Sequence, residues 1–286
     1  MSARFGPAGN ADSFPYKSST DAPRWLSGLG LDCYEYQCGK GVRVREETAR
    51  ALGAAAAEHG ITLSLHAPYF INPANPDPEA LQKTIGYLTA ACHAADQMGA
   101  RRVVMHSGAL MGRSRREALD TALASLKQIL RACDDAGFAH MTLCPETMGK
   151  LGQLGDLDEV LELCTLDERL VPCVDFGHLY ARSLGADEGA EACERMLTRM
   201  EQVLGADRAS RFHSHFSHIE FTPNGGEKCH RTFDDDGGFG PDWAPLAAAV
   251  ARRGWSPTFI CESAGTQAED ALTMKRIYAA LQTDGV

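Results

Sequence analysis

Short apolar runs rich in β-branched residues recur along the chain, and each is followed by a segment with helical periodicity. This alternation is typical of a (β/α)8 TIM barrel. The expected strands cover residues 3–9, 32–37, 61–66, 101–106, 141–146, 170–175, 211–217 and 257–262. The expected helices begin at residue 24 and cover 46–59, 78–98, 115–136, 157–164, 190–204, 242–253 and 267–281. Because no linker interrupts the pattern, it predicts one α/β domain over residues 1–286.

Most of the expected strands end in a histidine or a carboxylate. In a barrel of this kind the carboxyl ends of all strands converge on one mouth, so residues far apart in sequence meet there. Imidazole and carboxylate groups together suit zinc, whereas a set richer in oxygen suits manganese. The pattern therefore predicts a metal cluster formed by His66, His106, Glu146, Asp175, His215 and Glu262.

Further candidate residues follow or accompany two of these strands. Asp175 and His178 form an Asp-x-x-His turn, in which the carboxylate reaches one metal and the imidazole another; the alternative is that Asp175 caps a helix. His213 and His215 lie on one face of their strand, and we expect one to be a ligand and the other to support it. His218 has the opposite parity, and we expect it to face the helices.

The charge of the chain argues mildly against a nucleic-acid partner. Among 286 residues, 28 are Lys or Arg and 38 are Asp or Glu, which gives a formal net charge of −10 and no general basic footprint. DNA is not excluded, since bound divalent cations add positive charge where the carboxylates cluster.

The ten cysteines are scattered without a CxxC pair, which favours buried thiols in a reducing compartment over disulfides. No leader pattern opens the sequence, and no apolar run approaches the roughly 18 residues of a membrane span. We therefore expect a cytoplasmic protein with no membrane association. Nothing in the sequence indicates an obligate protein partner.

The residues that follow the strands also resemble the motifs of a known family. The collinear set is similar to the endonuclease IV family of apurinic/apyrimidinic DNA repair enzymes, within the xylose isomerase-like TIM barrel superfamily. It spans roughly residues 60–265 and also resembles, in part, sugar isomerases and epimerases with the same barrel. Its motifs are His66-Ala67-Pro68-Tyr69-Phe70-Ile71-Asn72, His106-Ser107-Gly108, Glu146-Thr147, Cys173-Val174-Asp175-Phe176-Gly177-His178, His215-Phe216-Ser217 and Glu262-Ser263.

This resemblance implies a cluster of two or three zinc ions. One ion would be bound by His66 and His106, and Glu146 would bridge it to a second ion. The second ion would also be held by Asp175, His215 and Glu262, and the third ion by His178.

The third site departs from the family's pattern. The family completes it with an Asp-x-His motif, whereas this chain has Glu227-Lys228-Cys229-His230. His230 remains, but Lys228 stands where the aspartate is expected. Glu227, Asp234 or a solvent ligand must substitute, or the third site is weak or empty.

The resemblance also implies an activity. It predicts a zinc-dependent hydrolase that cleaves DNA 5′ to abasic sites in DNA repair, with a metal-activated hydroxide as the nucleophile and Glu146 and Glu262 as catalytic residues. Tyr69 and Phe70 would contact the DNA and hold its base stack open. Their alternative role is an apolar plug at the rim of the barrel.

Two other interpretations remain open. A sugar isomerase or epimerase on the same barrel would use one or two Mn²⁺ or Mg²⁺ ions and a carboxylate pair such as Glu146 and Glu262. It needs about four ligands around one metal, and the larger set here favours zinc. A metal-bearing binding protein without turnover is the third interpretation, and its support is Lys228.

Overall fold

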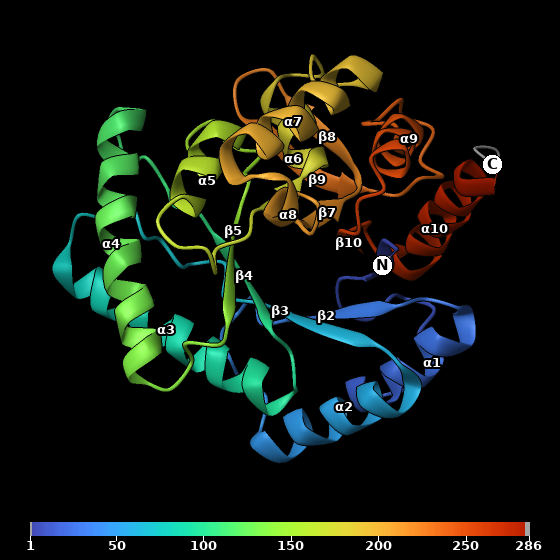
Figure 1. Ribbon diagram of the computed structural model, residues 1–286, viewed down its shortest axis with the longest axis horizontal. Coiled ribbons are helices and arrows are strands. Elements are labelled where there is room, and N and C mark those ends of the chain that lie inside the picture. Colours follow the sequence, from blue (N-terminus) through green and yellow to red (C-terminus); the bar gives the residue numbers. More distant parts are fainter. Residues whose placement is uncertain (1, 284–286) are drawn as a thin grey trace.

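Eight parallel strands line the centre of the molecule and helices surround them, as the computed structural model shows for residues 2–283 (Figure 1). The order around the sheet is β1-β10-β7-β6-β5-β4-β3-β2, so the predicted single-domain (β/α)8 barrel is confirmed. Residues 1 and 284–286 of the predicted domain lie outside the described part. The barrel strands are β1 (Arg4–Pro7), β2 (Cys33–Gln37), β3 (Thr62–His66), β4 (Arg102–His106), β5 (Thr142–Glu146), β6 (Cys173–Asp175), β7 (His213–Phe216) and β10 (Thr258–Cys261).

The helices follow the strands around the ring. They are α1 (Ala22–Leu29), α2 (Glu46–His59), α3 (Pro78–Gln97), α4 (Arg115–Asp135), α5 (Leu157–Cys164), α6 (Phe176–Arg182), α7 (Gly189–Leu204), α8 (Ala206–Ala209), α9 (Trp243–Arg253) and α10 (Gln267–Thr283), with a 3-10 turn at Ser19–Asp21. Local sequence sets several boundaries. Asp77 caps α3 ahead of Pro78, Ser114 and Glu117 form a capping box on α4, and Gly60 ends α2 in the left-handed conformation.

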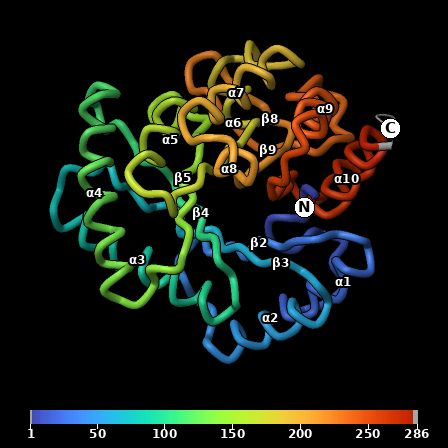
Figure 2. Tube along the Cα trace, viewed as in Figure 1, coloured from blue at the N-terminus to red at the C-terminus, as the bar shows by residue number. Residues whose placement is uncertain are grey.

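The barrel closes where β1 meets β2. An isolated bridge joins Ala8 to Glu35, and the Asp32 N–H donates to the carbonyl of Phe5 at 2.8 Å. A Cβ on Gly6 would lie 1.8 Å from the carbonyl oxygen of Cys33, so only glycine permits this close approach. Figure 2 shows the chain passing once around the ring until α10 (red) returns beside β1 (blue).

Two segments differ from the sequence-based prediction. Between strand seven and the helix expected at residue 242 the sequence pattern predicts no strand, but this segment contains a β-hairpin of β8 (His218–Thr222) and β9 (Gly226–Arg231). His218 therefore begins this hairpin and does not extend strand seven. Its ring stacks on Phe233 with centroids 4.8 Å apart, and the charges of Asp270 in α10 and Asp242 at the start of α9 act on it. The turn after Asp175 continues as helix α6, which is not among the expected helices but agrees with the alternative that Asp175 caps a helix.

The cysteines agree with the prediction of buried thiols. All ten are free, and nine are buried while Cys229 is partly exposed. None of the helices within residues 2–283 is long and apolar enough to cross a membrane.

Candidate metal centre

The predicted ligands meet at the mouth of the barrel because each stands at or next to the carboxyl end of a strand. His66, His106, Glu146 and Asp175 end β3 to β6, His215 lies in β7, and Glu262 directly follows β10. The mouth is a cavity of 340 Å³ lined by His66, Tyr69, His106, Glu146, Met148, Lys150, Gln153, His178, Glu227, His230 and Glu262. Asp175 and His215 are fully buried beside it.

Glu146 occupies the centre of the cluster. Its Oε2 lies 3.3 Å from Nε2 of His66 and 3.6 Å from Nε2 of His106. Its other oxygen, Oε1, lies 2.9 Å from Nδ1 of His215 and 3.7 Å from Nδ1 of His178. The two oxygens of one buried carboxylate thus face different sets of histidines, which is the arrangement that a bridging ligand requires.

Each of the five histidines at the mouth has one ring nitrogen held by a fixed partner. Those contacts are His66 Nδ1 with the Ala67 carbonyl (2.7 Å), His106 Nδ1 with the Tyr69 carbonyl (3.0 Å), His178 Nδ1 with the Thr147 carbonyl (2.9 Å), His215 Nε2 with Glu35 (2.9 Å) and His230 Nδ1 with the Ser217 hydroxyl (2.8 Å). The second nitrogen of each ring is left for the mouth. Metal-binding histidines commonly have this arrangement, because the outer contact fixes the tautomer and the ring orientation.

Strong electrostatic coupling links these groups. Burial alone would raise the pKa of Glu146, but His215 and His66 hold it well below its usual value. Burial alone would lower the pKa of His66 and of His178, yet Glu146 raises the first to about 9, and Asp175 with Glu227 raises the second to about 9. The buried carboxylates therefore favour positive charge at this mouth.

Asp175 carries an unpaired oxygen. Its Oδ1 accepts from the His178 backbone N–H at 2.7 Å, so it does cap α6. Its buried Oδ2 has no hydrogen-bond donor. Nδ1 of His178 lies 3.4 Å away but bonds to the Thr147 carbonyl. A buried unpaired carboxylate oxygen is unfavourable, and burial raises the pKa of Asp175.

The ligand atoms of Glu146, Asp175, His215 and Glu262 all lie within 4.8 Å of one another. This mixed nitrogen and oxygen set therefore fits a divalent cation, which would also satisfy the free oxygen of Asp175.

A further group is completed by the β8–β9 hairpin. His178, Glu227 and His230 offer ligand atoms within 4.8 Å of one another. Residues three apart on a regular strand point to opposite faces, but the register shifts here, since Glu220 pairs with Cys229 and Phe221 with Glu227.

This bulge brings Glu227 to the same side as His230. Lys228 instead contacts Glu220 at 2.5 Å, with more than half of its side chain exposed. Of the predicted substitutes for the family's aspartate, Glu227 lies in the group, whereas Asp234 is exposed and outside it.

Sequence reasoning missed one buried carboxylate, Glu35 in the middle of β2. It contacts His213 and His215, both at 2.9 Å, and accepts from Ser64 at 2.8 Å. A charge inside an apolar strand was the available signal, because such residues are rarely buried without partners. His213 and His215 do share one face, as predicted, and His215 is the one that reaches the mouth ligands.

The predicted aromatic pair lies on the loop after β3. Tyr69 is 60% exposed and Phe70 is 41% exposed, and their ring centroids are 5.5 Å apart. Phe70 also packs on Tyr87, with centroids 4.6 Å apart. The pair therefore stands exposed at the rim of the mouth, which Tyr69 also lines.

The chain is similar in sequence and in fold to several known proteins. It is 31% identical to an uncharacterized protein, MJ0133, of Methanocaldococcus jannaschii, over 87% of this chain and 88% of that protein. It is 27% identical to a probable endonuclease 4 of Shouchella clausii, over 56% of this chain and 54% of that protein. A solved D-tagatose 3-epimerase-like protein superposes with a TM-score of 0.72 at 17% identity, covering 99% of both chains. The model of the xylose isomerase-like TIM barrel family matches residues 23–278, and the chain belongs to that family.

Proposed function

We propose that the protein is a zinc-dependent, endonuclease IV-like phosphodiesterase that cleaves DNA 5′ to abasic sites and acts in DNA repair. One observation carries the proposal. Five histidines at the mouth each direct one ring nitrogen towards it. Four of them form three neighbouring groups with four carboxylates, and His106 lies 3.6 Å from Glu146 of these groups, which exceeds the needs of a single ion. A supply of nitrogen ligands this large favours zinc over manganese or magnesium.

The proposed ligands divide among three ions. His66 and His106 would hold the first, and Glu146 would join it to the second. The second would also be held by Asp175, His215 and Glu262, and the third by His178, Glu227 and His230. Bound zinc would lower the pKa of a coordinated water towards about 7 and so supply a hydroxide nucleophile at neutral pH.

The chain's own residues position the reaction. Glu146, fully buried among histidines, holds the two halves of the cluster at a fixed separation. Glu262 keeps 16% of its side-chain surface exposed beside the cavity, so it can accept a hydrogen bond from the attacking water and orient it. The water attacks phosphorus and the 3′ oxygen of the preceding nucleotide departs.

The rim offers groups suited to DNA. Exposed Tyr69 and Phe70 can stack against bases next to an extruded abasic nucleotide. Lys150 lines the mouth, and Lys40 and Arg43 line a neighbouring hollow next to β2. The Tyr69 N–H bonds to the carbonyl of Gly39 at 3.1 Å, so the aromatic loop and the cationic loop are joined.

A sugar epimerase is the second candidate. Glu146, Asp175, His215 and Glu262 alone form one complete four-ligand group, and a cavity of 340 Å³ is compatible with a small sugar. In this alternative the two glutamates move a proton on the substrate.

Metal analysis and paired assays decide between the candidates. Protein reconstituted with zinc is tested on a duplex containing one abasic analogue, and protein reconstituted with manganese is tested on free ketohexoses. We expect two or three zinc ions per chain and incision 5′ to the lesion, lost on chelation and restored by zinc. One manganese ion per chain with epimerisation of a ketohexose, and no incision at low salt, would overturn the proposal.

A further inference from the structure

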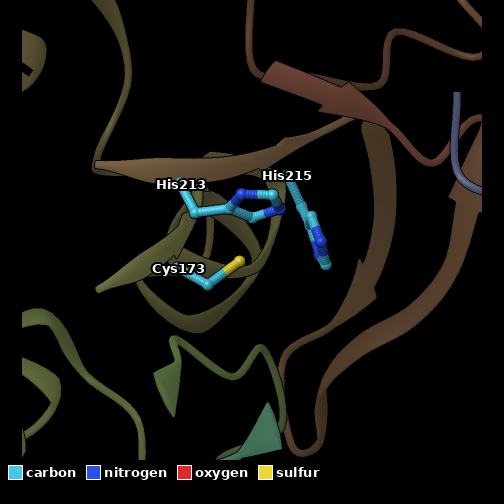
Figure 3. Close-up of side chains that lie close together, drawn as sticks. All are labelled: Cys173, His213 and His215. Atoms are coloured by element: carbon cyan, nitrogen blue, oxygen red, sulfur yellow. The ribbon is translucent and has the colours of Figure 1, made fainter. Parts of the chain in front are cut away.

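A column of polar side chains runs inside the barrel beneath the proposed metal centre. Glu35 of β2 contacts both His213 and His215. These two histidines project from the same face of β7 (Figure 3). All three residues are fully buried. The guanidinium of Arg102, at the opposite end of β4 from His106, reaches His213 from the other side.

The contacts of Glu35 determine which nitrogen of His215 is free. Glu35 Oε1 accepts from Nε2–H of His215 at 2.9 Å, so the ring nitrogen left to face the mouth is Nδ1. Nδ1 lies 2.9 Å from Glu146 and 3.5 Å from Glu262. The carboxylate thus selects the tautomer that presents nitrogen to the mouth.

The same contacts argue against a separate metal site at Cys173, His213 and His215, whose ligand atoms also lie close together. Nε2–H of His213 donates to Glu35 at 2.9 Å, and its Nδ1 accepts from Arg102 at 3.5 Å. Both nitrogens of His213 are therefore engaged, and the nearby cation opposes a second one. The buried groups form a support for His215.

We propose that Glu35 is a positioning residue of the metal centre. Its carboxylate holds His215 as the Nε2–H tautomer, so that Nδ1 of His215 binds metal. The inference rests on the proposed function through the metal site alone and requires no particular substrate. Carboxylate contacts of this kind fix the ring orientation of a ligand histidine and increase its basicity.

Glu35→Gln tests the inference because the surroundings dictate how the amide must lie. Oε2 of Glu35 accepts from Ser64 and His213, and Oε1 accepts from His215 and from the exposed amide of Gln37. The Gln37 amide can turn to present its own oxygen, whereas Arg102 keeps His213 a donor at Nε2. The amide oxygen of the variant is therefore expected at the Oε2 position and its NH₂ group opposite His215. His215 would then have to accept at Nε2 and carry its proton on Nδ1. Arg102 holds His213 in its original tautomer.

The first measurement is the tautomer of each histidine, from long-range proton–nitrogen NMR spectra of zinc-loaded protein labelled at histidine. We expect Nε2–H on His215 in the parent and its loss in Glu35→Gln, while His213 is unchanged. Glu35→Asp keeps two acceptor oxygens and should retain the Nε2–H signal. A parent whose His215 carries no Nε2–H would overturn the inference.

The second measurement is zinc affinity, by competition with a chelator of known affinity. We expect 10–100-fold weaker binding in Glu35→Gln, the usual effect of losing such a contact, and a smaller loss in Glu35→Asp. Glu159→Gln is the matched control, because Glu159 is also buried but pairs with Arg115 at 2.7 Å away from the mouth. It should bind zinc as the parent does, even if its stability falls.

These measurements distinguish a failure of the Glu35 proposal from a failure of the proposed metal centre. Unchanged zinc affinity and an unchanged His215 tautomer in Glu35→Gln, with zinc bound to the parent, would overturn the role of Glu35 alone. A parent that binds no zinc would overturn the metal centre and this inference together. Far-UV circular dichroism of each variant confirms that an affinity loss does not come from unfolding.

Discussion

Replacing Asp175 by asparagine should stabilise the metal-free protein while weakening its response to metal. The variant keeps an oxygen to accept from the His178 backbone N–H, which is the capping contact at 2.7 Å. It removes the buried charge on Oδ2, which has no hydrogen-bond donor. The replacement NH₂ group can donate to the neighbouring carboxylates of Glu146 or Glu262.

The size of the expected stabilisation follows from the unpaired Oδ2 oxygen of Asp175. An unsatisfied buried polar group costs about 1–3 kcal/mol, and more when charged. Burial raises the folded-state pKa of Asp175, so the metal-free parent loses stability as pH rises from about 4 through that raised pKa, and the loss persists at neutral pH. A neutral side chain removes this loss. At roughly 2 °C per kcal/mol, we expect the melting temperature without metal to rise by about 2–6 °C.

Metal should remove most of this difference, and it should reverse the order of the two melting temperatures when the metal-free rise is below about 5 °C. At a zinc concentration of about 1,000 times the parent's Kd, binding adds about 4 kcal/mol, or roughly 8 °C. A variant with about 100-fold weaker binding gains only about 1.4 kcal/mol, or roughly 3 °C, at the same concentration.

Differential scanning calorimetry at pH 7, with chelator and with zinc, measures the metal-free melting temperature and its increase when zinc binds. Asp156→Asn is the control, because Asp156 also caps a helix through its side chain but lies outside the candidate centre. That variant should keep the full response to zinc. A lower metal-free melting temperature for Asp175→Asn, or an unchanged response to zinc, would refute this reasoning.

Other substitutions test individual roles. Glu146→Gln should abolish turnover without unfolding the protein, since the bridging carboxylate is lost; near-normal hydrolysis with full metal occupancy would remove Glu146 from that role. Glu227→Gln should lower bound zinc by about one ion per chain by elemental analysis, whereas Lys228→Gln should leave it unchanged; equal zinc contents would contradict the assignment. Joint replacement of Tyr69 and Phe70 by alanine should weaken abasic-duplex binding by roughly 1–3 kcal/mol per lost stacking contact while sparing the metals and hydrolysis of a small phosphodiester; full duplex cleavage would exclude the wedge.

The sequence predicts most of the mouth because its signals are local. A strand that ends in His66 or Glu146 places that side chain at the mouth once the barrel is recognised, whatever the rest of the chain does. The position of Glu35 in a buried strand was equally readable, but its role was not. That role depends on Ser64 and His213 from two other strands, and such pairings exist only in the closed barrel.

The third group shows a different limit of sequence reasoning. The family's Asp-x-His motif puts Lys228 at the position of the ligand aspartate, because that spacing assumes a regular strand. The bulge in β9 adds one residue and so changes which side chains share a face of the strand. A Glu-x-x-His spacing therefore places Glu227 beside His230. A bulge is set by pairing with β8, and nothing in the spacing of β9 alone reveals it. The departure at Lys228 is therefore weaker evidence for a lost site than the sequence suggests, since the backbone compensates for the changed spacing.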